Sequence, residues 1–499
     1  MEGVAPARRW TLVAVCATTF MLLVDITIVN VALPSIQRQL HASLTGLQWV
    51  VDAYAVTLAA LILTAGALAD RYGRRLVFAG GVVVFSIASF LCGAAWNVVT
   101  LDIARVLQGI GGAALFATAL ALIGAEYTGP ERAGAIAVWG STVGLGVASG
   151  PLLGGILTDS LSWRWVFFVN VPVGAFAFAV AMRKLRESRD PGARRTDVAG
   201  LVSFSSALFL IVQALLRGND AGWSSAQIVG SLLAGVVLLV AFAVVEIRQE
   251  RPMLDVALFR RPAFLGVQFA TFCIGAGMFA LFPFLSIYLQ DILGYSPLGA
   301  GLRFLPITVF IFAVPIATRK LSARVPMWTL LSVSLAIVAL GALLMEDISP
   351  GSGWTALLAG FIVSGIGIGL ANPTIAAAAL KVVDPARTGM ASGISNTCRI
   401  GGLAMGVAVL GAVLQQRVGS HLAAAGYPGK ELASAVSSSG LRAAGGRPAL
   451  TNVAEAAFVS GLRLVLLIGF AAVLAGGIGA AVLVRRRVEA AEAVLEPAP

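Results

Sequence analysis

Charge is scarce in this sequence. Only 12% of its 499 residues are charged and 58% are hydrophobic, whereas a soluble globular chain carries roughly 25% charged residues. So few charges could not cover the surface of a water-soluble fold. An apolar span needs about 20 residues to cross the hydrocarbon core of a bilayer, so this length holds roughly a dozen to fifteen spans. The composition therefore predicts an all-α polytopic membrane protein.

Cysteine and histidine are also scarce, which argues against several kinds of site. The four cysteines fall inside apolar runs with no short spacing between them, so we expect buried thiols and no disulfide or metal framework. The two histidines lie in predicted outside loops and do not suit a metal site. The chain has no GxxxxGK[ST] phosphate loop, so nothing points to ATP as the energy source. We expect no metal and no cofactor. These residues are Cys16, Cys92, Cys273, Cys398, His41 and His421.

The basic excess of the chain fits orientation in a bilayer better than a nucleic-acid partner. The net charge is +11, but the basic residues lie in short breaks between apolar runs and form no basic face interleaved with aromatics. About fourteen runs are predicted, and the first is expected to remain as a helix and not to be a cleaved signal peptide. The runs begin near Trp10, Leu47, Val77, Val98, Ala133, Trp163, Val198, Ala226, Ala263, Leu298, Met327, Trp354, Thr388 and Ser460.

Basic residues cluster in every second break, which fixes the predicted orientation. By the positive-inside rule these breaks and both termini face the cytoplasm, so we expect a multi-pass protein of the cytoplasmic membrane. The alternation requires an even number of spans. The last outside break, about 416–459, is rich in Ala, Gly and Ser and is expected to be a mobile connector. The basic breaks include Arg71, Arg74, Arg75, Arg132, Arg183, Lys184, Arg248, Arg260, Arg319, Lys320, Lys381 and Arg387.

An internal repeat divides the chain. The stretch beginning at Pro130 (PERAGAIA) recurs at Pro385 (PARTGMAS), and just upstream QGIGG at Gln108 recurs as SGIGI at Ser364. These pairs relate the fourth and fifth runs to the twelfth and thirteenth. We therefore predict a six-helix bundle at 1–185, two additional helices with cytoplasmic linkers at 186–258, and a second six-helix bundle at 259–499. Repeated bundles with a site at their interface are the usual construction of secondary transporters.

The first and fourth runs carry charges at a similar depth in the membrane. Counting at about 1.5 Å per residue puts Asp25, in VDITIVNVALP, about 13 Å deep and Arg105, in DIARVLQG, roughly 12 Å deep. A lone acid there is costly, so Asp25 should face the interior and have a partner, for which Arg105 is the candidate. Protonation of Asp25 would release the pair. The alternative is a purely structural ion pair.

Two other acids are candidates for the same machinery. Asp102 is three residues before Arg105 and therefore shares its helical face. Asp52 lies about five residues into the second run, where an outer vestibule is the alternative environment.

Two further patterns are rich in glycine. The break after the second run reads GALADRYGRR, from Gly66 through Asp70, Arg71, Gly73 and Arg74. The fifth run reads GVASGPLLGG and contains Gly146, Gly150, Pro151, Gly154 and Gly155. Glycines every four residues make a smooth face for close helix packing, and Pro151 is expected to bend that helix.

These four patterns resemble the major facilitator superfamily, specifically its fourteen-helix drug:proton antiporter branch. The resemblance covers nearly the whole chain and is densest from Asp25 to Pro172. It implies the major facilitator fold, with two six-helix bundles plus two extra helices. It also implies that the Gly66–Arg74 element is a breakable latch between the halves, and that the glycine pattern of the fifth run accompanies export. A basic turn that merely orients the chain is the alternative for the latch.

The second half offers fewer candidates. Phe361 and Gly360 stand where the repeat places Arg105, so the charged machinery is expected to lie mainly in the first half. Arg399 is at mid-depth without an evident acid partner and could contact substrate or backbone carbonyls. Aromatic residues of the ninth run could line a lipophilic cavity, although packing against other helices is the alternative. The predicted cavity set is Asn30, Gln108, Phe279, Tyr288 and Arg399.

The sequence thus predicts a monomeric secondary transporter that exchanges protons for a lipophilic small molecule such as a drug, driven by the proton gradient. It is not predicted to be an enzyme. Two alternatives stay open. The same fold could support proton-coupled uptake of a nutrient or metabolite, or it could be retained by a non-transporting membrane sensor.

Overall fold

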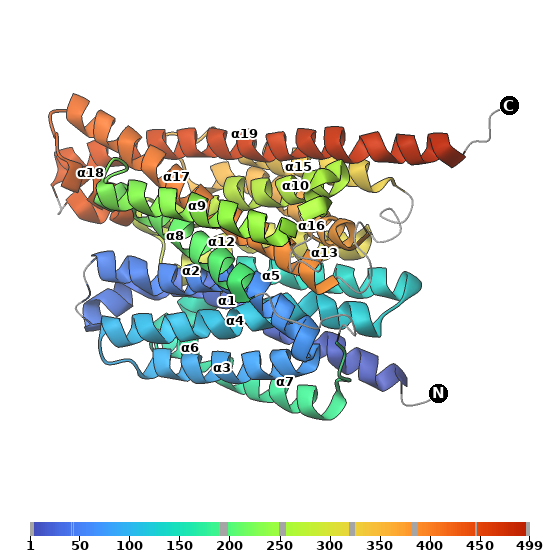
Figure 1. Ribbon diagram of the computed structural model, residues 1–499. Coiled ribbons are helices and arrows are strands. Elements are labelled where there is room, and N and C mark those ends of the chain that lie inside the picture. The colour runs from blue at the N-terminus through green and yellow to red at the C-terminus, as the bar shows by residue number, and fades with distance from the viewer. Residues whose placement is uncertain are drawn as a thin grey trace.

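The fold is taken from a computed structural model that describes residues 4–40, 42, 44–189, 198–248, 256–318, 325–381, 388–444 and 447–495. Within these ranges the chain is helical and contains no strand. The helices lie side by side in one long bundle (Figure 1). The N-terminal end of α1 and the C-terminal end of α19 lie at the same end of it.

The first part of the chain forms a group of closely packed helices. Helix α1 packs against α5 and α7, while α4 lies between α2 and α3, and α3 also packs against α7. The side chain of Asn97 accepts a hydrogen bond from the Thr100 N–H at 2.8 Å, which caps the start of α4. The elements are α1 (Val4–Leu40), α2 (Leu44–Tyr72), α3 (Arg74–Ala94), α4 (Val98–Glu126), α5 (Gly129–Ser160), α6 (Trp165–Phe168) and α7 (Asn170–Lys184).

Two helices, α8 (Val198–Ala221) and α9 (Ala226–Arg248), follow this group. They pack against each other, and α8 also contacts α2. Helix α9 exposes most of its apolar surface, as Val237 with 64% exposure illustrates. An apolar face of this extent suits contact with lipid.

The last part of the chain repeats the packing order of the first. Its elements are η1 (Val256–Arg260), α10 (Pro262–Gly277), η2 (Phe279–Leu281), α11 (Phe282–Ile287), η3 (Tyr288–Ile292), α12 (Pro297–Arg303), α13 (Leu305–Ala317), α15 (Met327–Leu344), η4 (Trp354–Leu357), α16 (Leu358–Lys381), α17 (Thr388–Ala424), α18 (Lys430–Ser439), η6 (Gly440–Ala444) and α19 (Pro448–Leu495). Helix α10 packs against α17 and α19, and α15 against α16 and α19. These contacts mirror those of α1 with α5 and α7, and of α3 with α4 and α7.

Many of these helices are long and apolar enough to cross a membrane. In the described residues ten qualify as they stand, or eleven if α2, which bends by 49° between Ile62 and Thr64, is one span. Shorter apolar stretches occur in α5, α8 and α13. Apolar side chains on the outside of the bundle are widely exposed, such as Ile87 at 58% and Ile316 at 63%. The protein is therefore a multi-pass membrane protein.

The helix starts mostly agree with the predicted runs, but the last outside loop does not. Helix α17 continues to Ala424 and α19 begins at Pro448, so the connection is shorter than the predicted 416–459 and holds α18 and η6. The reason is an amphipathic pattern: Leu450, Ala454 and Phe458 in α19 are buried at spacings of four residues. Ala433 and Val436 of α18 are buried in the same apolar core.

Candidate functional site

A completely buried ion pair lies inside the first group of helices. Asp25 of α1 and Arg105 of α4 both have no exposed surface, and Arg105 Nη1 donates a hydrogen bond to Asp25 Oδ2. The structure thus brings together the two charges that the sequence predicts at a common depth. A single buried charge in a membrane is costly, and an oppositely charged partner offsets part of that cost.

Neutral side chains complete the coordination of the Asp25 carboxylate. Gln108 Nε2 donates to Asp25 Oδ1 at 2.9 Å, and Asn170 Nδ2 donates to the same oxygen at 3.0 Å. Both amides also donate to Ser89 Oγ, each at 2.9 Å. Gln108 Oε1 in turn accepts from Arg105 Nη1 at 2.7 Å. The carboxylate is therefore held by donors from α4 and α7, and Ser89 of α3 orients two of them.

Gln108, which was predicted to line the substrate cavity, lies within this network. It is fully buried beside the ion pair. The reason is its spacing, because a residue three positions after Arg105 lies on the same face of α4, which is turned toward α1. Ser89 and Asn170 were not predicted at all.

Helix α2 fixes the Arg105 guanidinium from its other side. Arg105 Nε donates to the Val50 carbonyl at 2.8 Å, and its Cζ lies 4.2 Å from the centroid of the Tyr54 ring. Such a cation–π contact is attractive and strengthens when it is desolvated. Nη2 makes no hydrogen bond within the described structure. Arg105 thus links α1, α2 and α4 through one planar group.

Asp102, another predicted acid, is not part of this network in the described structure. Asp102 is partly buried, its Oδ1 has no hydrogen-bond partner among the described residues, and it makes no ion pair with Arg105 there. The side chains of Asn30, Asp52 and Pro151 lie outside the part of the chain that the structure describes. In the described residues, no group of three or more His, Cys, Asp and Glu side chains is placed to hold a metal ion.

The glycines of α5 face α1 at very short range. A Cβ atom at Gly146 would lie 2.9 Å from Leu23 Cβ, and one at Gly154 would lie 2.9 Å from the Ile28 carbonyl oxygen. At Gly150 it would lie 2.7 Å from Thr27 Cβ and 3.0 Å from the Ile28 nitrogen. The glycine face therefore lets α5 contact the helix that carries Asp25, and α5 remains helical through position 151. Gly155 is also buried.

We expect Gly150→Ala to separate α1 from α5 and to reduce both thermal stability and transport. Overpacking of this kind typically costs about 1–3 kcal/mol. Gly80→Ala is the matched control, because a Cβ at Gly80, also in the middle of a helix, would meet nothing within 4 Å. Thermal unfolding of the two purified variants in detergent checks the prediction. Equal midpoints would show that the α1–α5 contact tolerates a side chain.

The predicted latch element forms the turn between α2 and α3. Arg74 Nη2 makes an ion pair with Asp70 Oδ1 at 2.8 Å, and Gly73 has φ 123°, a backbone conformation that strongly favours glycine. Arg71 lies over the Tyr72 ring, with its Cζ 4.9 Å from the centroid. Gly66 is buried within α2. These contacts place the predicted element in one compact turn.

Sequence reasoning missed Glu187, which anchors this turn to the segment after α7. Its Oε1 accepts from the Arg75 N–H at 3.0 Å and its Oε2 from the Leu76 N–H at 3.1 Å. A carboxylate at a helix N-terminus satisfies otherwise unpaired N–H groups and interacts favourably with the helix dipole. Glu187 therefore caps α3 from a distant part of the sequence.

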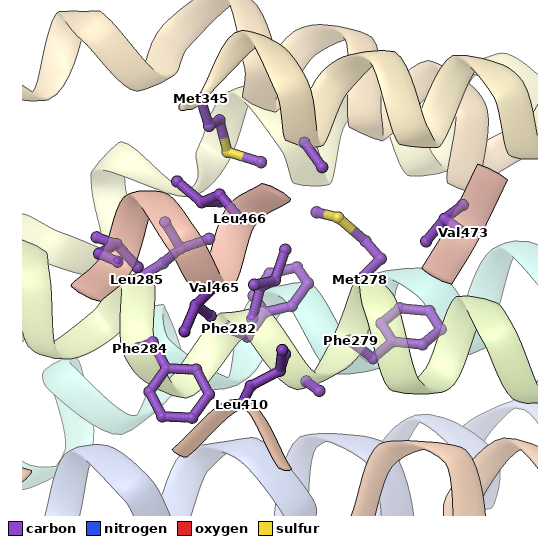
Figure 2. Packing of buried hydrophobic residues seen from close by; sticks show 14 of the residues in the cluster. Met278, Phe279, Phe282, Phe284, Leu285, Met345, Leu410, Val465, Leu466 and Val473 are labelled. Carbon is purple, nitrogen blue, oxygen red and sulfur yellow. The ribbon is translucent and has the colours of Figure 1, made fainter. Parts of the chain in front are cut away.

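Two predicted cavity residues of the second half are core residues. Phe279 and Tyr288 are 5% and 1% exposed, and both belong to the large apolar cluster that α10–η3 forms with α15, α17 and α19. Figure 2 shows Phe279 and Phe282 among side chains such as Leu410 of α17 and Val465 of α19. The Tyr288 hydroxyl donates to the Ser352 carbonyl at 3.2 Å. Packing thus prevails over cavity lining at these positions.

The long apolar helices and their repeated packing order are typical of membrane transporters that are built from internal repeats. The chain belongs to the Major Facilitator Superfamily, whose family model matches residues 15–407.

Known proteins of similar sequence include resistance proteins. The puromycin resistance protein pur8 of Streptomyces alboniger is 39% identical over 428 residues, which cover 85% of each chain. The multidrug resistance protein Stp of Mycobacterium tuberculosis (strain CDC 1551 / Oshkosh) is 37% identical over 81% of this chain and 75% of its own. Among solved structures, a bacterial homolog of the human lysosomal transporter Spinster, in an inward-facing and unoccupied conformation, is 19% identical. It covers 97% of this chain and 98% of its own with a TM-score of 0.60, and supports the fold alone.

Proposed function

We propose that this protein is a proton-driven antiporter that exports lipophilic small molecules, such as drugs or antibiotics, across the cytoplasmic membrane by alternating access. The observation that carries the proposal is the fully buried Asp25 carboxylate, held by Arg105, Gln108 and Asn170. An ionisable residue buried in a membrane span is by default a functional group. The similarity to resistance proteins supports small-molecule export as the function that this group drives.

The proposed architecture has fourteen spans, with six-helix bundles at 1–185 and 259–499 and two additional helices between them. The packing of α10, α15, α16, α17 and α19 in the same order as α1, α3, α4, α5 and α7 supports this division. The location of both chain ends at one end of the bundle supports an even number of spans, with both termini cytoplasmic (Figure 1). We propose that the working unit is a monomer.

In the proposed mechanism, a proton from the outside neutralises Asp25 and weakens its pairing with Arg105. Protonation adds a donor to a carboxyl that is surrounded by three donors, so the network must rearrange. Movement of α1 would be transmitted to α5 through the glycine face. The latch turn consists of Gly66, Asp70, Arg71, Gly73 and Arg74. Its contacts between the two halves would break and form again as the two bundles rock. One charge moving through 100 mV yields about 2.3 kcal/mol, enough for roughly a fifty-fold substrate gradient.

The direction of flux distinguishes export from uptake. We expect everted membrane vesicles with an acidified lumen to accumulate radiolabelled lipophilic antibiotics, because protons leaving the lumen would drive substrate into it. Vesicles without the protein, and vesicles treated with a protonophore, serve as controls. Acid-driven loss of preloaded compound would instead favour proton-coupled uptake. Absence of gradient-dependent flux across a broad panel would favour a membrane sensor.

A further inference from the structure

Arg399 lies on a helix of the second proposed bundle that also packs against the first. Its helix, α17, packs against α10 and α19 on one side and against α2 and α4 on the other. We call the contact between residues 1–185 and 259–499 the seam. Ile394 and Ile400 are buried in the apolar cluster of the first bundle, and Asn396 Nδ2 donates to the Phe116 carbonyl of α4 at 3.5 Å. The turns around Arg399 are therefore part of the seam.

The Arg399 guanidinium is buried without compensation. The residue is 7% exposed, and it makes no ion pair or side-chain hydrogen bond with any residue that the structure describes. Its Nη1 is fully buried and has no partner. The neighbouring helices α10 and α16 contain no acidic residue. Arg105 is the opposite case, because its guanidinium contacts Asp25, Gln108 and the Val50 carbonyl. A structural role would have given Arg399 similar partners.

Further unsatisfied polar atoms lie along the same seam. Ser395 Oγ is buried without a hydrogen-bond partner in the described structure, and Ser395 precedes Arg399 by four positions on the same helical face. On α16, both amide atoms of Asn372 are also unpaired, and its Nδ2 lies 3.4 Å from the position of a Cβ at Gly144 of α5. A buried cation with hydrogen-bonding groups beside it, between apolar walls, suits an amphiphile with an anionic group.

We propose that Arg399 binds the anionic group of the transported compound, so that lipophilic acids, carboxylates above all, are the preferred substrate class. The inference rests on the proposed export function and adds the charge of the substrate to it. A guanidinium binds a carboxylate through two parallel hydrogen bonds, and the low dielectric constant of the seam strengthens them. The same uncompensated charge repels cationic drugs. Ser395 contributes a neutral hydrogen bond beside the carboxylate.

The test uses two probes that differ only in charge, dansyl-phenylalanine and its neutral primary amide. Binding to purified protein is followed by dansyl fluorescence, and transport by uptake into everted vesicles with an acidified lumen. We expect the wild type to prefer the carboxylate. We expect Arg399→Gln to weaken carboxylate binding at least about tenfold and to leave amide binding within twofold. Arg399→Lys should recover part of the preference, because it restores the charge but not the planar fork.

Arg417→Gln is the matched control. Arg417 lies on the same helix but is exposed, and its Nε donates to Ser460 Oγ. The substitution therefore removes one positive charge outside the seam. This variant should bind both probes as the wild type does. Equal loss of both probes in Arg399→Gln, or no charge preference in the wild type, would overturn the proposal. Charge-selective binding without gradient-driven flux would support the anion site and count against proton-driven export.

Discussion

We expect Asp25→Asn to abolish the proposed proton-driven export and to leave the protein folded in the membrane, with lower stability because Arg105 loses its acidic partner. Asparagine is similar in size, and its single amide oxygen can still accept hydrogen bonds at one of the two positions, either from Arg105 or from Gln108 and Asn170. It cannot take up or release a proton. We therefore expect gradient-driven transport in everted vesicles to fall to the level of vesicles that lack the protein.

Substrate exchange without a gradient separates coupling from binding in this variant. Counterflow of labelled against unlabelled compound should persist in Asp25→Asn, because exchange needs no net proton movement. Asp159→Asn makes the same chemical change at an exposed position near the end of α5 and should transport normally. Gradient-driven export by Asp25→Asn at the wild-type rate would end the assignment of Asp25 as the proton carrier.

Removing Arg105 has the largest expected effect on stability. Arg105→Gln deprives Asp25 and the Val50 carbonyl of their donor, and it removes the cation over the Tyr54 ring. The buried carboxyl must then stay charged without its partner or bind a proton permanently, and either outcome is unfavourable. Breaking one side of a buried ion pair typically costs about 3–5 kcal/mol. We expect a large drop in the thermal unfolding midpoint and no gradient-driven transport.

A double variant tests whether charge balance is the cause. Asp25→Asn combined with Arg105→Gln leaves no unpaired charge, so it should regain part of the stability lost in Arg105→Gln while remaining unable to couple transport to protons. Arg105→Lys should fall between, because lysine keeps the charge but cannot contact Val50 and Asp25 as a fork does. If the double variant is less stable than either single variant, the lost hydrogen bonds matter more than the charges.

The charged members of the buried network were predictable from the sequence, and the neutral ones were not. A charge in an apolar run is stabilised by an opposite charge at its own depth, and this preference selects Arg105 for Asp25. A hydroxyl in such a run carries no similar constraint. The Thr18 hydroxyl, for example, donates to the Ala14 carbonyl of its own helix at 3.0 Å. Nothing in the sequence distinguishes that threonine from Ser89, whose role depends on how α3 packs against α7.

The order of helices was likewise predictable, whereas connections that depend on distant contacts were not. The apolar runs gave the starts of α4, α8, α9, α15 and α17 at the residues where the structure begins them. The early start of α19 depends on the burial of one face against neighbouring helices. A segment that is apolar on one face only does not stand out as an apolar run in the sequence. The role of Glu187 could not be predicted, because it is one acid in a charged loop. The start of α3, which it caps, lies 111 residues earlier in the chain.

The side chains that hold Asp25 all belong to one bundle, while the unpaired Arg399 belongs to the other. Under the proposed function, the proton and the substrate therefore bind at different sites and need not compete. Under the proposed function, we expect substitutions near Arg399 on α17 to change the range of exported compounds without affecting proton coupling. An inhibitor that binds beside Asp25 would by contrast stop the proposed export of every substrate.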